Sequence, residues 1–308
     1  MQHYQSLDQI SLDYTWLTIG IFDGIHLGHR VLLSRLVEGA RAAGATSVVL
    51  TLHPHPAVIL GGQSDYAYLT TQEEKSAILA DIGVDVVITL PFSQELAADT
   101  AQDFIQRVYL ALHMHHLVLG HDTALGRGRE GNATLLAEIG RQLGYDLEVV
   151  PPLRQETRVI SSSMIREQLR KGSVGQAAAA LGRWYSLTGP VVHGDGRGRK
   201  IDIPTANIRL PSGKLIPANG IYATWAWVDG KRVAAATNIG INPTFTPGRT
   251  IPSVEAHLLD FQSELYGSEL KLEFVERLRD ELKFSSVEAL LEQIQVDISR
   301  CRQILSGA

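Results

Sequence analysis

Two histidines, His26 and His29, lie three residues apart in a glycine-bracketed segment that follows an apolar run. The run ends at Phe22, and the residues after Arg30 are apolar at helical spacing, which predicts a strand, a tight loop and a helix. Residues three apart are neighbours on a helix, so both imidazoles are expected on one face at its start. The amides and dipole of a helix N-terminus favour bound phosphate, and two imidazoles there suit a phosphate that gains charge in a transition state.

A simpler alternative is that the two histidines only cap the helix or face solvent. Against it, the pair follows a buried-looking strand, and open α/β sheets bind their ligands at the carboxyl ends of strands. In that setting the His-x-Gly-His pattern resembles the nucleotidyltransferase superfamily, whose members transfer a nucleotidyl group from a nucleoside triphosphate. This resemblance by itself does not name the acceptor.

A second phosphate-binding pattern is the segment Ile-Ser-Ser-Ser-Met-Ile-Arg at residues 160–166, which predicts the start of another helix. The hydroxyls of Ser162 and Ser163, the free amides of the helix start and the guanidinium of Arg166 would together cradle a polyphosphate leaving group. The alternative is an ordinary serine cap with a surface arginine. The histidine segment upstream favours the phosphate site.

The segment His-Pro-His-Pro at residues 53–56 ends another predicted strand, over residues 47–52. Its prolines stop the strand and hold an extended loop. Two histidines separated by a proline could bind a metal, but the sequence places no third ligand nearby. The preferred interpretation is the edge of a ligand site at the carboxyl end of the strand.

A glycine-arginine loop at residues 194–199 begins a second group of polar motifs. Gly194 and Arg197 are candidate phosphate-binding residues there, although the loop matches neither a dinucleotide fingerprint nor a Walker loop. Pro204 then holds the chain extended, so Thr205 and Asn207 project to the same side. Their oxygens suit a magnesium ion that also bridges nucleotide phosphates. The alternative is a threonine and an asparagine that close a turn.

Residues 253–261 alternate as a strand does, with one apolar and one polar face. Glu255 and His257 share the polar face. A carboxylate that a rigid strand holds in place can accept a proton from an attacking hydroxyl, which makes Glu255 a candidate general base. A glutamate at a solvent-exposed edge is the commoner alternative.

The composition indicates a soluble protein of two domains, with 308 residues, 44% hydrophobic and 20% charged. A net charge of −5 argues against a nucleic-acid partner, which usually requires a basic surface. The single cysteine fits a reducing cytoplasm. The sequence shows neither a secretory leader nor an apolar run that could cross a membrane, so we expect a cytoplasmic protein without a membrane partner.

The chain changes its pattern near residues 181–185. Before this point, strands and helices alternate, which predicts an α/β, Rossmann-like domain with a parallel sheet. After it, short alternating strands with glycine turns predict a small antiparallel barrel or sandwich, including a two-residue hairpin turn at Asp229 and Gly230. Helical spacing over residues 286–305 predicts a C-terminal helix. We therefore expect domains at residues 1–183 and 184–308.

Taken in order, these segments resemble the bacterial bifunctional riboflavin kinase/FAD synthetase family almost from end to end. The segments that carry the resemblance are residues 20–29, 54–56, 120–122, 160–166, 189–194, 204–207, 219–222, 238–244 and 254–261. The resemblance implies a nucleotidyltransferase domain, then a small β-barrel riboflavin kinase domain with a C-terminal helix. It also implies ATP as co-substrate, riboflavin, FMN and FAD as substrates and products, and Mg²⁺ as cofactor. We expect a monomer or a weak homo-oligomer.

The resemblance also implies a division of roles. The C-terminal domain would phosphorylate riboflavin to FMN, with Glu255 as base and with Thr205 and Asn207 holding Mg²⁺ and the ATP phosphates. The N-terminal domain would adenylylate FMN to FAD and release pyrophosphate, with His26 and His29 stabilising charge at the α-phosphate. The other residues assigned to the two sites are Gly20, Phe22, Asp23, Gly24, Asp122, Ser162, Ser163, Arg166, Gly194 and Arg197.

The chain departs from the family pattern at two places. Family members usually carry Gly-x-Asp-Phe-x-Phe-Gly, but here Thr123 and Leu125 replace the two rings, on which an isoalloxazine or an adenine could stack. Asp202 replaces a glycine before the Pro-Thr-Ala-Asn segment and would repel nearby phosphates. Two alternatives therefore stay open: an enzyme with only its kinase half active, and a catalytically silent flavin-binding or regulatory protein.

Overall fold

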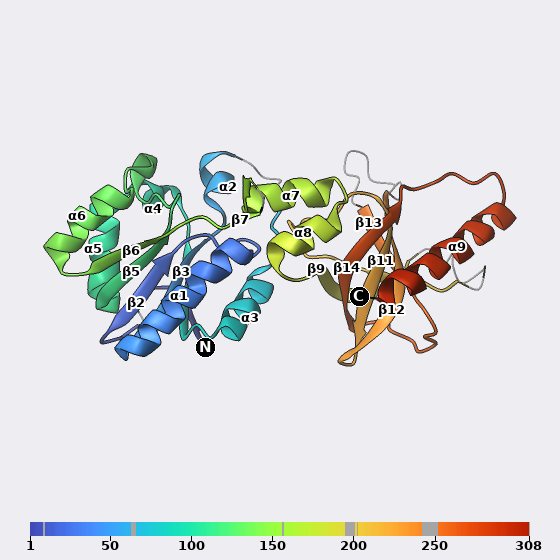
Figure 1. Cartoon of the computed structure of the whole chain (residues 1–308), viewed down its shortest axis with the longest axis horizontal. Helices are drawn as coiled ribbons and strands as arrows, with labels where there is room; N and C mark the ends of the chain where they lie inside the picture. The colour runs from blue at the N-terminus through green and yellow to red at the C-terminus, as the bar shows by residue number, and fades with distance from the viewer. Residues whose placement is uncertain are drawn as a thin grey trace. The chain divides into compact units, whose positions relative to one another are not determined.

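The computed structural model describes residues 1–8, 10–62, 66–155, 157–194, 201, 203–241 and 252–307. The chain forms two compact units, Met1–Ser162 and Ser163–Ala308, and each has its own sheet (Figure 1).

The N-terminal unit contains a six-stranded sheet in the order β1-β4-β3-β2-β5-β6, in which every pairing is parallel. Its strands are β1 (Gln2–Tyr4), β2 (Thr15–Ile19), β3 (Thr46–His53), β4 (Val86–Pro91), β5 (Met114–Gly120) and β6 (Asp146–Val150). The predicted parallel sheet is confirmed. The strand order reverses at β2, which places the loop after β2 at the switch point where such sheets bind ligands.

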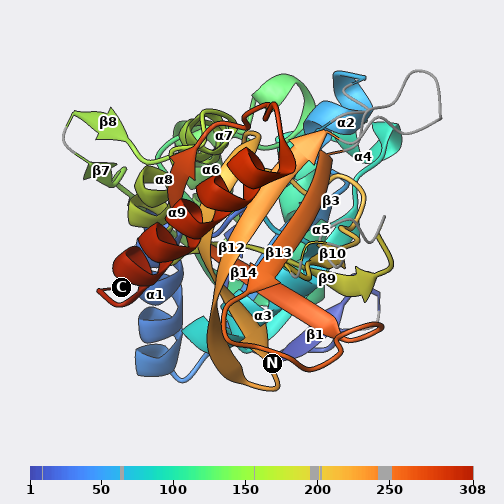
Figure 2. The same cartoon turned by 90° about the vertical axis from the view of Figure 1, so that its right-hand side faces the viewer.

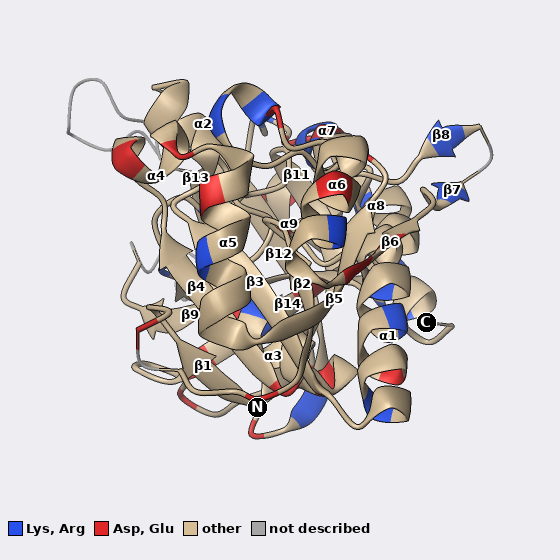
Figure 3. Cartoon of the chain, turned by 90° about the vertical axis from the view of Figure 1, so that its left-hand side faces the viewer, with Lys and Arg blue, Asp and Glu red and all other residues tan. Residues whose placement is uncertain are grey.

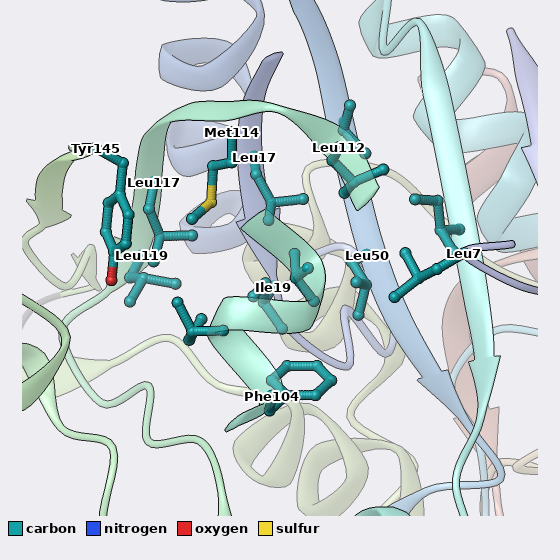
Figure 4. Packing of buried hydrophobic residues seen from close by; sticks show 14 of the residues in the cluster. Leu7, Leu17, Ile19, Leu50, Phe104, Leu112, Met114, Leu117, Leu119 and Tyr145 are labelled. Atoms are coloured by element: carbon teal, nitrogen blue, oxygen red, sulfur yellow. The ribbon is translucent and has the colours of Figure 1, made fainter. Parts of the chain in front are cut away.

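Helices cover both faces of this sheet (Figure 1). The helices α1 (Leu27–Ala43) and α3 (Gln72–Ile82) pack on one face, and α5 (Ala101–Leu112) and α6 (Ala133–Leu143) pack on the other. Figure 4 shows Leu17, Ile19 and Leu50 of the strands packed with Phe104 and Leu112 of α5. Because both faces are covered, the strands can be apolar throughout. Shorter elements complete the unit: α2 (Pro56–Leu60), α4 (Gln94–Ala98), η1 (Arg127–Arg129), β7 (Arg154–Gln155) and β8 (Arg158–Val159).

The cap of α3 differs by one residue from what its sequence suggests. The pattern Thr-Thr-Gln-Glu-Glu predicts a capping box from Thr70 to Glu73. The structure uses Thr71, whose hydroxyl accepts from the Glu74 amide, while the Glu74 carboxylate accepts from the Thr71 amide. Thr70 is not available as the cap because its hydroxyl is bonded within the loop after β2.

The second unit is built on a closed antiparallel barrel in the order β10-β13-β12-β11-β14-β9. Its elements are α7 (Ser162–Arg170), whose first residue belongs to the N-terminal unit, α8 (Val174–Leu181), β9 (Tyr185–Val192), β10 (Ala206–Ile208), β11 (Gly220–Val228), β12 (Lys231–Ile241), β13 (Pro252–Leu258), β14 (Glu269–Arg279) and α9 (Val287–Leu305). Asp229 and Gly230, at φ +48° and +76°, form the predicted hairpin turn. The C-terminal helix α9 lies across the barrel (Figure 2) and contacts β11, β12 and β14.

The second compact unit begins before the predicted domain boundary at 183/184, because α8 packs on β9 and β14. As a boundary between two functions, 183/184 stays a prediction. No helix within the described ranges has both the length and the apolar character needed to cross a membrane. Basic and acidic residues both occur along helices such as α1 and α6 in the N-terminal unit (Figure 3).

Gly39 of α1 lies against the indole of Trp16, where an added Cβ would be 2.0 Å from Cζ3. The indole is also stacked on His116, at 3.9 Å between ring centroids, so it cannot easily move away. We expect Gly39→Ala to lower the free energy of unfolding by about 1–3 kcal/mol, although alanine normally gains about 1 kcal/mol over glycine in a helix.

Gly175 of α8 provides the matched control, because its added Cβ would meet nothing closer than the Val275 carbonyl oxygen at 3.8 Å. Gly175→Ala should raise the free energy of unfolding by up to about 1 kcal/mol. Urea denaturation of the two variants and the wild type measures both effects. A stabilised Gly39→Ala variant would contradict the packing argument.

Candidate functional sites

The loop after β2 has an unusual backbone. The strand ends at Ile19, not at Phe22 as the apolar run suggested, because the chain turns into left-handed conformations at Phe22 (φ 51°), Gly24 (φ 83°) and Ile25 (φ 37°). Such angles are costly for bulky and β-branched residues. Phe22 and Ile25 are 3% and 0% exposed, so burial of their side chains offsets this cost. Strained backbone that the surrounding structure holds in place is typical of ligand-binding loops.

Asp23 connects this loop to the segment just before α3. Its carboxylate is 2% exposed and accepts hydrogen bonds from the amides of Leu69, at 3.0 and 3.1 Å, and Thr70, at 3.2 Å. The Thr70 hydroxyl accepts from the Gly24 amide at 3.1 Å. Asp23 therefore organises the loop, and its contact with a nucleotide stays a prediction.

His26 and His29 lie on one face at the start of α1, as predicted. His26 is the N-cap, and its Nδ1 accepts from the His29 amide at 3.3 Å. The two rings are stacked, with centroids 3.7 Å apart. Nδ1 of His29 is buried and makes no hydrogen bond with the described residues. Burial of the His29 side chain lowers its pKa well below the usual value, and the nearby charges of His26 and Lys75 lower it further. This imidazole is therefore neutral at pH 7.

Lys75 of α3 lies beneath the same loop, and sequence reasoning missed it. It is 3% exposed, and its Nζ donates to the Ile21 carbonyl at 2.8 Å and to the Thr51 hydroxyl at 3.4 Å. Burial lowers its pKa to about 8, an effect that Asp23 opposes. A lysine in the polar first turns of a helix normally faces solvent, so the local sequence carries no signal of this contact.

The helix α7 begins at Ser162, whose hydroxyl donates to the Asp23 carbonyl at 2.8 Å. Ser162 of the predicted serine segment therefore contacts the histidine loop within the N-terminal unit, although 139 residues separate the two partners. Ser163 is exposed and Arg166 is half-buried, one turn further along α7, and both belong to the second compact unit.

The loop after β5 contains the residues that depart from the family pattern. The Asp122 side chain is 82% exposed, while its carbonyl accepts from Nη2 of Arg129 at 3.1 Å. Leu125 packs against the core cluster and forms a β-bridge with Gly131.

In the loop after β2, a Cβ on Gly20 would lie 3.0 Å from the Phe22 ring.

In the barrel, strand register brings the predicted polar residues together. Glu255 of β13 pairs with Asn207 of β10 on one side and with Asn238 of β12 on the other. The Thr205 hydroxyl donates to Oε2 of Glu255 and the Ser253 hydroxyl to Oε1, each at 3.4 Å. Asn238 was not among the predicted site residues, because its position beside Glu255 depends on the register of two strands. Its Oδ1 is buried and makes no hydrogen bond with the described residues.

Two cavities of the barrel unit share Thr205. One cavity, of about 320 Å³, lies between the barrel and α9. Glu255 and Asn238 line it on the barrel side, and Leu290 and Ile294 line it on the side of α9. The other, of about 400 Å³, is lined by Pro204 and Thr205 and by residues 261–266. Glu255 lines the first cavity, and Thr205, which lines both, donates its hydroxyl hydrogen bond to Glu255, so both cavities lie next to the surroundings of this carboxylate.

Gly194 lies directly against the Asn207 amide, since an added Cβ would be 2.4 Å from Nδ2. Arg197 and Asp202 lie outside the described residues. Within the described ranges, no three His, Cys, Asp or Glu side chains form a group that could hold a metal ion. A cation at Thr205 and Asn207 would thus depend largely on the phosphates of its substrate.

The sequence and the fold both match known proteins. Residues 9–164 match a family model described as FAD synthetase, and residues 181–305 match one described as riboflavin kinase. The bifunctional riboflavin kinase/FMN adenylyltransferase of Listeria monocytogenes serovar 1/2a is 36% identical over 284 residues, which cover 91% of this chain and 89% of that protein. The enzyme of the same description from Escherichia coli K12 is 35% identical over 300 residues, which cover 97% and 95%. A crystal structure described as a macrolide-efflux protein from Streptococcus pneumoniae superposes with a TM-score of 0.91 at 29% identity, covering 97% and 98% of the two chains.

The burial of Lys75 predicts a pH-dependent stability. An unfolded lysine keeps its proton up to about pH 10.5, whereas the folded protein releases it near pH 8. Between these values the unfolded state binds more protons, so the free energy of unfolding rises with pH. Relative to Lys75→Met, the wild type should gain about 2 kcal/mol between about pH 7.5 and about pH 10, at roughly 1.4 kcal/mol per pKa unit.

Urea denaturation of both proteins at the two pH values measures this gain. Lys231→Met, at an exposed lysine of β12, is the control and should retain the wild-type dependence on pH. If the free energies of unfolding of the wild type and Lys75→Met differed by the same amount at both pH values, the lowered pKa of Lys75 would be contradicted.

Proposed function

Because the chain belongs to the family of bifunctional riboflavin kinases/FMN adenylyltransferases, we propose that it converts riboflavin to FAD in two ATP-dependent steps. The observation that carries the proposal is that the two family matches cover different parts of the chain, each with its own polar site. We further propose that the enzyme acts in the cytoplasm as a monomer or a weak homo-oligomer.

The first step takes place at the barrel, between its two cavities. Riboflavin occupies the cavity beside α9, and ATP occupies the one beside residues 261–266. Glu255 accepts the proton of the ribityl 5′-hydroxyl while the oxygen of that hydroxyl attacks the γ-phosphorus of ATP. The new P–O bond forms as the bond to ADP breaks, so FMN and ADP are the products. The position of Glu255 between Asn207 and Asn238 supports this role, since both neighbours can orient the hydroxyl and the carboxylate.

Thr205 and Asn207 fit the Mg²⁺ that this step requires. A hydroxyl and a carboxamide oxygen are hard ligands, and Mg²⁺ commonly adds substrate phosphates and waters to a few protein oxygens. The Thr205 hydroxyl already lies within 3.4 Å of a carboxylate oxygen, and the bare backbone of Gly194 leaves room for the Asn207 amide. When bound, the ion would neutralise charge on the phosphates.

The second step takes place at the start of α1. A phosphate oxygen of FMN attacks the α-phosphorus of a second ATP, the bond between the α- and β-phosphates breaks, and pyrophosphate leaves. His26, His29 and the amides of the helix start stabilise the negative charge that develops at the α-phosphate. The low pKa of His29 means that it acts as a neutral hydrogen-bonding group. The residues we assign to the departing pyrophosphate are Ser162, Ser163 and Arg166.

The remaining predicted residues act through the backbone or at the edge of the sites. Gly20, Phe22 and Gly24 shape the loop that approaches the nucleotide, and Asp23 fixes that loop. Asp122 is assigned to ATP in the N-terminal site. In the barrel, Gly194 and Arg197 are assigned to the ATP phosphates.

Incubation of the purified protein with riboflavin, ATP and Mg²⁺, followed by chromatography of the flavins, tests the proposal. FAD is the expected end product, with FMN as an intermediate. FMN alone would favour the alternative in which only the kinase half is active. No conversion would favour the silent flavin-binding protein.

Substitutions in the two sites should separate the two activities. Glu255→Gln should reduce riboflavin phosphorylation by roughly 10²–10⁴-fold, because the general base is lost, and should leave adenylylation of added FMN unchanged. His29→Ala should reduce adenylylation by roughly 10²–10³-fold and leave phosphorylation unchanged. Each activity is the folding control for the other variant. Loss of both activities in a folded variant would refute the assignment of separate sites.

A further inference from the structure

Four aromatic rings gather beyond the end of β3 in the N-terminal unit, and neither of the two proposed reactions gives them a role. The His55 and Tyr66 rings are stacked, with centroids 4.1 Å apart. Tyr66 meets Tyr68 edge-on at 4.8 Å, and Tyr68 lies 5.6 Å from His53. All four side chains are half-buried, and none belongs to the hydrophobic core clusters of this unit. The rings therefore keep exposed surface that the fold itself does not require.

Polar contacts hold these rings in position. The Tyr68 hydroxyl accepts from the His55 amide at 2.9 Å, and the Gln72 amide lies 2.8 Å from Nδ1 of His53. Nδ1 of His55 caps α2 by accepting from the Ala57 amide at 3.0 Å. A surface arranged in this way binds a flat ligand with little loss of side-chain entropy.

The aromatic cluster is attached directly to the loop that carries the histidines. Tyr68 precedes Leu69 and Thr70, whose amides bind the carboxylate of Asp23, three residues before His26. In addition, β3 is the hydrogen-bonded neighbour of β2, and parallel strands end at the same edge of the sheet. The rings and the proposed site of adenylyl transfer therefore lie at one edge of one sheet.

The loop on the other side of β2, after β5, offers no comparable surface. Residues 120–126 contain no Phe, Tyr or Trp, and Leu125 packs against the core. The two substrates of adenylyl transfer must reach the α-phosphate from different sides, because attack and departure are in line. The larger ring system needs the larger aromatic surface, and that surface lies on the β3 side.

We propose that Tyr66, supported by His55 and Tyr68, forms the surface on which the isoalloxazine ring of FMN stacks during adenylylation. The isoalloxazine is flat and electron-poor, and stacking on a tyrosine ring favours its binding. This inference rests on the proposed adenylylation of FMN, and it assigns the acceptor to the β3 side and the adenine of ATP to the β5 side.

Steady-state kinetics of FAD formation from FMN and ATP test the proposal. Tyr66→Leu removes the ring and keeps an apolar side chain, so the KM for FMN should rise about tenfold or more. The kcat, the KM for ATP and riboflavin phosphorylation should stay near the wild-type values. Tyr66→Phe retains the ring and should retain the wild-type KM for FMN.

Tyr14→Leu is the matched control. Tyr14 also contacts a histidine, with its ring centroid 4.4 Å from that of His115, but it precedes β2 and so lies at the opposite edge of the sheet. This variant should leave the KM for FMN unchanged.

An unchanged KM for FMN in Tyr66→Leu would overturn the proposal while leaving adenylylation itself established. A rise in the KM for ATP alone would also overturn it, because adenine would then be the stacked ring. If the wild-type protein formed no FAD from FMN, the proposed function of this unit would fail first, and the inference with it.

Discussion

The buried carboxylate of Asp23 is the interaction on which the N-terminal site depends. It accepts the amides of Leu69 and Thr70, and the carbonyl of the same residue accepts the hydroxyl of Ser162. Three segments far apart in the chain therefore meet at one residue. The left-handed backbone on either side of it would cost about 1–3 kcal/mol at each bulky residue without such anchoring. A buried carboxylate with several amide donors is one of the stronger anchors available to a loop.

The barrel positions its polar residues by a different principle. Glu255, Asn207 and Asn238 are neighbours because three antiparallel strands pair in one register, and no loop needs to be held in place. The apolar residues that alternate with Glu255 along β13 face the interior of the barrel. A shift of the strand register by one residue would therefore turn Glu255 into the core. The register of the site is therefore protected by the same burial that stabilises the barrel.

Electrostatics also distinguish the two sites. Near the start of α1, burial lowers the pKa values of both His29 and Lys75, and the charges of His26 and Lys75 lower that of His29 further. At the barrel, the polar centre is an acidic and neutral set of oxygens, which suits proton acceptance and a hard cation.

The sequence by itself determined the fold class, the helix that carries His26 and His29, the hairpin at residues 229–230 and the two faces of β13. These features follow from periodicity and turn chemistry, which are local. It placed the cap of α3 one residue early, since two registers of the same pattern are locally equivalent. Lys75 and the aromatic cluster around Tyr66 could be found only in the tertiary structure. The partners of Lys75 lie 54 and 24 residues away, and no local pattern records a contact across such a distance.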